Sequence, residues 1–102
     1  MAKQYTALVI GNAAYTQVGQ LSNPANDADD VAARLKARGF TVIKKTDCTH
    51  KAMDKALKEF RDGLATTDVA LFFFAGHGMQ IDGDNYLAAT DVDASTDVEG
   101  TR

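Results

Sequence analysis

A histidine between two glycines, Gly76-His77-Gly78, is the feature of this sequence that points most directly to chemistry. Imidazole exchanges protons near neutral pH, and flanking glycines let the backbone turn sharply and approach a ligand closely. The motif directly follows an apolar run, residues 69–75, so the ring is expected at the end of a strand and outside the core. We therefore predict that His77 is a general acid/base; the alternative is a turn histidine satisfied by its own neighbours.

A base needs a nucleophile to act on, and the single cysteine, Cys48, is a poor candidate. Asp47 beside it disfavours the thiolate, so we expect a semi-buried structural thiol. One cysteine excludes an internal disulfide framework and suits a reducing compartment. His77, His50 and the late aspartates lack the spacing of metal ligands, so neither a metal nor a cofactor is expected.

The elements that must position His77 alternate between strand and helix. Strand patterns cover residues 5–10, 41–45 and 69–75, and a short one covers 86–90. One helix begins at Asn23-Pro24 and ends at Gly39, and Thr49 caps a second one. The apolar faces of the two helices comprise Ala28, Val31, Ala32 and Leu35 in the first and Met53, Ala56, Leu57, Phe60 and Leu64 in the second.

This order predicts an α/β domain with a mostly parallel sheet flanked by helices. Ligands of such sheets gather beyond the carboxyl ends of the strands. His77 leaves the sheet there, and the first helix starts there with Asn26 and Asp27. Residues 69–75 are apolar enough for the middle of a sheet, yet no full-length strand follows them. Because an open apolar edge aggregates, we expect further polypeptide to pair beside this strand.

The composition and charge of the chain exclude several classes of function. The 102 residues suffice for one domain at most, and 45% hydrophobic with 25% charged residues is typical of a globular chain. A net charge of −3 argues against nucleic-acid binding. No apolar run approaches the roughly 20 residues of a membrane-spanning helix, and the N-terminus leaves no room for a signal peptide. A cytoplasmic protein without a membrane partner is expected.

Several segments together resemble the caspase-like cysteine peptidases, and metacaspases and bacterial homologues more than animal caspases. The matching segments are residues 72–80 (FFFAGHGMQ), 7–12, 21–35 with Asn26-Asp27-Ala28, 39–42 and 85–91. They cover most of residues 5–93 in the order of that family. The resemblance implies that residues 1–102 are the N-terminal, histidine-bearing part of a single catalytic domain, a three-layer sandwich that is incomplete in this chain.

The resemblance also implies a Cys-His dyad without a cofactor. His77 would be the general acid/base, and the Gly78 amide would form part of the oxyanion hole. The nucleophilic cysteine of the family follows the histidine by about fifty residues, on the next strand. We therefore expect it on polypeptide beyond residue 102, in a C-terminal segment or a small-subunit chain.

Substrate preference follows from the same resemblance. Metacaspase-like enzymes hold arginine or lysine with acidic groups, and Asp27 is the candidate pocket floor. Its alternative role is stabilisation of the first helical turn. Ala75 stands where several relatives carry serine, so one hydrogen bond of the pocket is expected to be missing. Cleavage of the chain's own backbone after Arg102, in a polar stretch, is a further expectation; the alternative is a boundary of other origin.

The acidic residues after Gln80 could hold calcium, as in some metacaspases, although their spacing is irregular. Two other readings of the chain stay open. One is a caspase-like domain that binds partners without catalysis. The other is a phosphoacceptor signalling domain, which would need acidic groups where Asn12 and His77 stand.

Overall fold

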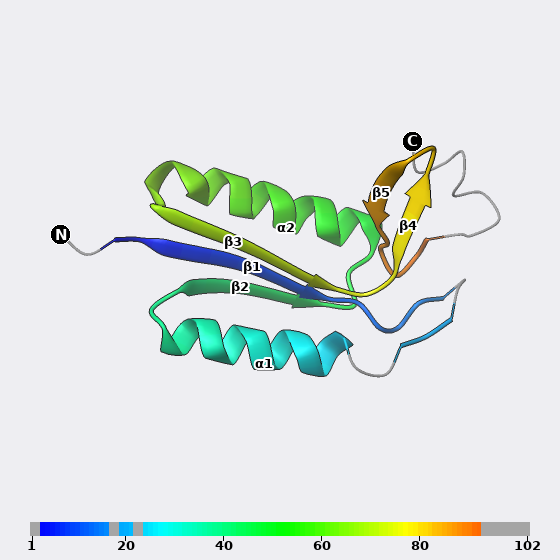
Figure 1. Cartoon of the computed structure of the whole chain (residues 1–102), viewed down its shortest axis with the longest axis horizontal. Coiled ribbons are helices and arrows are strands. Elements are labelled where there is room, and N and C mark those ends of the chain that lie inside the picture. Colours follow the sequence, from blue (N-terminus) through cyan, green and yellow to red (C-terminus); the bar gives the residue numbers. More distant parts are fainter. Residues whose placement is uncertain (1–2, 17–18, 22–23, 93–102) are drawn as a thin grey trace.

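The computed structural model describes residues 3–16, 19–21 and 24–92. Within them the chain alternates strand and helix and then ends in a hairpin (Figure 1). The elements in chain order are β1 (Tyr5–Gly11), α1 (Pro24–Ala37), β2 (Thr41–Thr46), α2 (His50–Gly63), a 3₁₀ turn (Leu64–Thr66), β3 (Val69–Ala75), β4 (Gly78–Ile81) and β5 (Asp84–Leu87). The three long strands and both helices agree with the sequence prediction.

The three long strands form a parallel sheet in the order β2-β1-β3. Helix α1 covers one face and α2 covers the other, so the domain has three layers (Figure 1). The predicted α/β architecture with a mostly parallel sheet flanked by helices is therefore confirmed.

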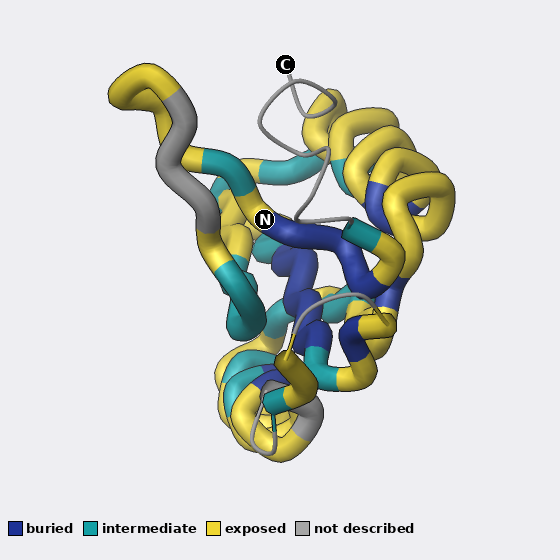
Figure 2. Tube along the Cα trace, turned by 90° about the vertical axis from the view of Figure 1, so that its right-hand side faces the viewer, coloured by how far each residue is buried: buried dark blue, intermediate teal, exposed yellow. Residues whose placement is uncertain are grey.

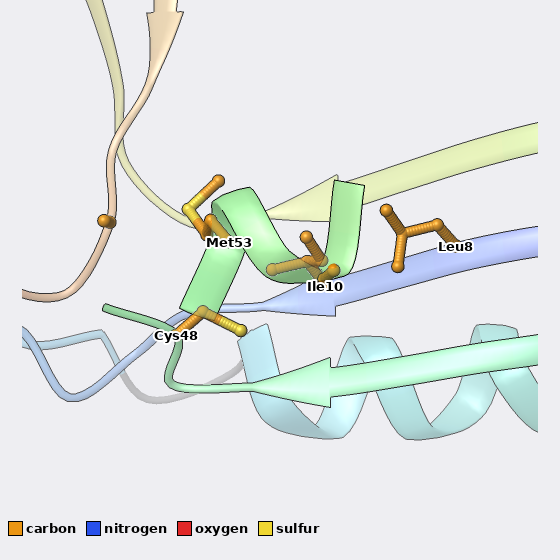
Figure 3. Packing of buried hydrophobic residues seen from close by; sticks show 6 residues of the cluster. Leu8, Ile10, Cys48 and Met53 are labelled. Carbon is orange, nitrogen blue, oxygen red and sulfur yellow. The ribbon is translucent and has the colours of Figure 1, made fainter. Parts of the chain in front are cut away.

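Strand β1 is the centre of the core because its side chains alternate between the two faces. Leu8 and Ile10 pack with Met53 and Ala56 of α2, and Cys48 completes that cluster (Figure 3). On the opposite face Val9 packs with Ala28 and Ala32 of α1. The burial map shows the same arrangement, with buried residues at the centre and exposed helix turns outside (Figure 2).

Strand β3 lies at one edge of the sheet among the described residues. Its register pairs Leu8 with Phe72, so Phe72 lies on the α2 face, while Leu71 lies on the α1 face. Leu71 is 37% exposed and Phe72 is 41% exposed. The prediction of a strand that needs a neighbour is consistent with this exposed apolar edge.

The end of the described chain differs from the prediction of a strand over residues 86–90. Strands β4 and β5 form an antiparallel hairpin, and residues 88–90 are buried beyond it. Asp82 and Gly83 make the turn with φ angles of 51° and 84°. An Asp-Gly pair favours a two-residue hairpin turn, since both positions need positive φ. This signal in the sequence was missed.

Both helices have local start or stop signals. Thr49 caps α2, because its hydroxyl accepts a hydrogen bond from the Ala52 N–H at 3.2 Å. Gly39, with φ 90°, follows the end of α1, as is typical of helix C-termini. None of the helices in the described part of the chain has the length and apolarity to cross a membrane.

Candidate functional site

His77 lies in the turn that joins β3 to β4, at the carboxyl edge of the parallel sheet (Figure 1). Both of its backbone polar groups are held. Its N–H donates to the Tyr15 hydroxyl at 2.8 Å, and its C=O accepts from the Ala88 N–H at 2.9 Å. The hydrogen bonds to Tyr15 and Ala88 therefore fix the position of the His77 backbone, from which the imidazole extends.

The imidazole itself has a defined partner. Its Nε2 lies 2.6 Å from the carbonyl oxygen of Gly19. A carbonyl oxygen only accepts hydrogen bonds, so Nε2 must carry the proton, and in the neutral ring Nδ1 keeps the lone pair. The ring also meets Tyr15 edge-on, with centroids 4.5 Å apart and planes at 61°. Nδ1 is thus the nitrogen that can take up a proton from a reacting group.

The two glycines beside His77 meet different physical requirements of the turn. A Cβ on Gly76 would come within 2.6 Å of the Tyr15 hydroxyl oxygen and 2.8 Å of the Phe74 ring, so any other residue there would force one of these side chains to shift. Gly78 pairs with Leu87, one step from the hydrogen-bonded pair of His77 and Ala88. Since hydrogen-bonded and non-hydrogen-bonded pairs alternate in antiparallel ladders, the Gly78 N–H points away from β5. It is exposed and able to donate to another group.

Asn12 joins the loops at this edge of the sheet. It is fully buried directly after β1; its Oδ1 accepts from the Cys48 N–H at 2.8 Å and its Nδ2 donates to the Ala88 C=O at 3.2 Å. Asp47, with φ 53°, accepts from the N–H groups of Ala13 and Ala14 at 2.9 and 3.0 Å. These bonds hold the beginning of the loop that carries Tyr15 and Gly19.

The two residues predicted for substrate binding lie on the same face of the sheet. Asp27 is exposed in the first turn of α1. Ala75 ends β3, two residues after Phe73, which packs against the cluster under α1. Because side chains alternate along a strand, Ala75 also faces the α1 side. Asp29, on the same helix as Asp27, pairs with Lys44 at 2.5 Å.

Cys48 belongs to the core. It is 4% exposed and packs with Leu8, Ile10 and Met53 (Figure 3). Burial raises the pKa of its thiol; Lys45 lowers that pKa to a smaller extent and Asp47 raises it further. We predicted a semi-buried structural thiol; the structure buries it in the core, which agrees with the structural role and corrects the degree of burial.

Two other predictions concern the C-terminal part of the chain, which the structure describes only in part. Arg102, the predicted processing site, lies outside them, as do the last three acidic residues. Within residues 3–16, 19–21 and 24–92, no cluster of three or more His, Cys, Asp or Glu side chains is arranged to hold a metal ion.

Sequence reasoning missed three residues of the site. Tyr15 and Gly19 lie between the predicted strand over residues 5–10 and the helix predicted to begin at Asn23-Pro24. Asn12 was considered only as a position where a phosphoacceptor domain would need an acidic group. A signal was present for Asn12, because a polar residue directly after a buried strand must have its hydrogen bonds satisfied. Gly19 contributes its backbone carbonyl, a group that every residue type has, so the sequence contains no signal for this contact.

The fold and the site define a class: an α/β domain that holds an imidazole at the carboxyl edge of a parallel sheet, with its own thiol buried in the core. A family model for the caspase domain, Peptidase_C14, matches residues 4–98, so the chain belongs to this family. It is thus a caspase-like domain of a peptidase-family protein, as the resemblance implied. The closer likeness to metacaspases stays a prediction.

Two mammalian proteins are similar to this chain. They are "Mucosa-associated lymphoid tissue lymphoma translocation protein 1" of Homo sapiens and its homolog in Mus musculus. Each is 31% identical to the chain over 91 residues, which are 89% of this chain and 11% of the relative. The chain therefore spans only a small part of the length of these relatives.

Proposed function

We propose that the 102 residues are the N-terminal, histidine-bearing part of one catalytic domain of a cysteine endopeptidase. The observation that carries the proposal is the arrangement of His77, whose Nε2 is held by the Gly19 carbonyl so that Nδ1 remains the basic nitrogen. Membership of the caspase-domain family supports the same reaction. The dyad partner is a cysteine on further polypeptide, because Cys48 is buried in the core.

The reaction follows from these groups. Nδ1 of His77 takes the proton of the attacking thiol, and the thiolate sulfur adds to the carbonyl carbon of the scissile amide. The outward Gly78 N–H donates to the oxyanion that forms, a contact that can be worth about 3 kcal/mol. The imidazolium then gives its proton to the leaving amine, and water hydrolyses the thioester. No cofactor takes part, and calcium would act only on folding or activation.

The exposed edge of β3 supports the proposal that the cysteine arrives on a neighbouring strand. Apolar side chains of the strand are exposed on both faces of this edge: Phe72 on the α2 side and Leu71 on the α1 side. A further parallel strand with its own cover would bury them. The partner is a C-terminal segment of the same gene product or a small-subunit chain.

We further propose that the enzyme cleaves after arginine or lysine. Asp27 supplies the acidic group, and Ala75 on the same face of the sheet has no side-chain group that could add a hydrogen bond. A negatively charged substrate residue would be repelled by Asp27, and no basic residue occurs between Lys3 and Arg34 to hold it. With the same preference, the enzyme would cleave its own chain after Arg102, in the acidic stretch of the sequence, as an activating step. The protein acts in the cytoplasm, without nucleic-acid or membrane partners.

The catalytic test uses the chain together with the polypeptide that follows it in its gene. His77→Ala should abolish cleavage of an arginyl peptide. His50→Ala is the matched control, because the only other histidine is exposed on α2, 3.3 Å from Asp54, and should retain activity. Equal activity of the two variants would refute the mechanism. No cleavage by the unmutated protein, with no cysteine on the next strand, would favour the non-catalytic binding domain.

Specificity is tested with arginyl, lysyl and aspartyl peptides. Asp27→Asn should raise KM for the basic substrates, while Asp30→Asn, an exposed charge on the same helix, should not. Cleavage after aspartate but not arginine would refute the preference. Arg102→Gln and the intact mass of the product test processing, and assays with EDTA or added calcium test the metal dependence.

A further inference from the structure

Tyr15 is the largest fully buried side chain of the domain, although it lies in a loop. It is 2% exposed, and its hydroxyl makes two hydrogen bonds. The hydroxyl oxygen accepts from the His77 N–H at 2.8 Å, and the hydroxyl proton goes to the Ala88 C=O at 2.9 Å. Tyr15 therefore connects the loop after β1, the histidine turn and the segment after β5.

Tyr15 contacts both the backbone and the ring of His77. Besides the hydrogen bond to the N–H, the tyrosine ring lies edge-on to the imidazole at 4.5 Å. The same loop supplies Gly19, whose carbonyl holds Nε2 at 2.6 Å. One buried anchor thus contacts both the backbone and the ring of His77, and it lies four residues before the glycine whose carbonyl holds Nε2.

The site is built around the hydroxyl and not around an aromatic ring alone. Glycine at position 76 leaves room for the Tyr15 hydroxyl oxygen, which lies 2.6 Å from where a Cβ would stand. Burial raises the pKa of Tyr15, so the hydroxyl keeps its proton and remains donor and acceptor at once. Phenylalanine would fill the ring space and lose both bonds. The Ala88 C=O would still accept a hydrogen bond from Asn12 Nδ2 at 3.2 Å, so the His77 N–H is the group that would lose its hydrogen-bond partner.

We propose that Tyr15 is the positioning residue of the catalytic histidine: its hydroxyl fixes the His77 backbone and so directs Nδ1 toward the attacking thiol. This inference rests on the proposed function. Sub-ångström placement matters here because proton transfer requires hydrogen-bond distance, and a displacement of about 1 Å can slow a reaction about 100-fold.

The test compares Tyr15→Phe with Tyr5→Phe in the chain extended by its downstream polypeptide. Tyr5 is a matched control, because it stands at the opposite end of β1 with its ring against Phe40 at 5.1 Å. Both variants are assayed where far-UV circular dichroism shows them folded. We expect Tyr15→Phe to lower kcat about 10- to 100-fold with KM within about twofold, and Tyr5→Phe to change neither.

The second readout is the ¹⁵N spectrum of the His77 imidazole, which separates a protonated Nε2 from a bare Nδ1. Tyr15→Phe should average the two signals, whereas Tyr5→Phe should preserve them. In an active enzyme, a kcat or a spectrum of Tyr15→Phe equal to that of Tyr5→Phe would overturn the inference. If no variant and no parent cleaves any peptide, averaged signals in Tyr15→Phe would support the positioning and refute the peptidase.

Discussion

Asn12 gives the sharpest test of how this edge of the domain is held. Its side chain is fully buried, and one amide serves two loops: Oδ1 accepts from the Cys48 N–H and Nδ2 donates to the Ala88 C=O. Nδ2 also lies 3.6 Å from the sulfur of Met53. The three contacted residues come from the loop after β2, the segment after β5 and α2.

Replacing Asn12 with alanine has a cost that the contacts define. Ala88 keeps a donor in the Tyr15 hydroxyl, whereas the buried Cys48 N–H loses the acceptor that holds it. An unsatisfied buried donor costs about 1–3 kcal/mol, and the empty amide space adds to it. We expect Asn12→Ala to lower the free energy of unfolding by about 2–4 kcal/mol. Asn26→Ala, at an exposed position of α1, should change it by less than about 0.5 kcal/mol.

The substitution Asn12→Asp should make the free energy of unfolding depend on pH through the same site. When protonated, the carboxyl can still donate to the Ala88 C=O, but when ionised it faces that oxygen and the Met53 sulfur without a donor. The folded state should therefore raise the pKa of the new carboxyl above the unfolded value of about 3.9. The unfolded chain then ionises first, so stability falls as the pH rises from about 4 and levels off once the folded carboxyl ionises too.

The measurement is urea unfolding followed by far-UV circular dichroism between pH 4 and 8. A rise of about two pH units in the pKa corresponds to about 2.7 kcal/mol between the ends of this range. The difference between Asn12→Asp and the parent chain should grow by about that amount. A difference that stays constant with pH, or an Asn12→Ala variant as stable as Asn26→Ala, would refute the bridging role of this amide.

Three further outcomes are expected. Thr49→Ala should destabilise the domain by about 1 kcal/mol in urea unfolding, because α2 loses its cap; an unchanged midpoint would contradict the capping. Gly76→Ala should cost about 1–3 kcal/mol, and Tyr15→Phe in the same chain should recover only part of this, since the Phe74 ring also meets the new Cβ; full additivity of the two changes would contradict the clash. The Cys48 thiol should be alkylated much more slowly in the folded chain than in urea at pH 8, because burial raises its pKa; equal rates would contradict its burial.

The sequence was sufficient for the elements that follow from periodicity and local signals. The strand over Val69–Ala75 was predicted at its observed bounds, and the start of the second helix was predicted at the observed Thr49 cap. Helical spacing was enough to predict the apolar faces of α1 and α2. These features are local, and each has a physical signal in adjacent residues.

The contacts of the site were not predictable in the same way. The bond from Tyr15 to His77 spans 62 positions, and the bond from His77 to Gly19 spans 58. Such pairs arise only when the parallel order β2-β1-β3 brings the carboxyl ends of the strands together. The hairpin of β4 and β5 was missed for a different reason: the Asp82-Gly83 turn signal was available, but the acidic composition around it obscured the strands.

The two properties of β3 have one explanation. The strand delivers His77 at its carboxyl end, and it also presents apolar side chains on both faces of an exposed edge. A parallel strand paired with β3 would lie about 4.8 Å away and end at the same edge of the sheet. Its last residue would then lie beside the turn that holds His77. The edge that needs a partner for burial is thus the edge where a partner's thiol would reach Nδ1, so completing the sheet and completing the proposed dyad are one event.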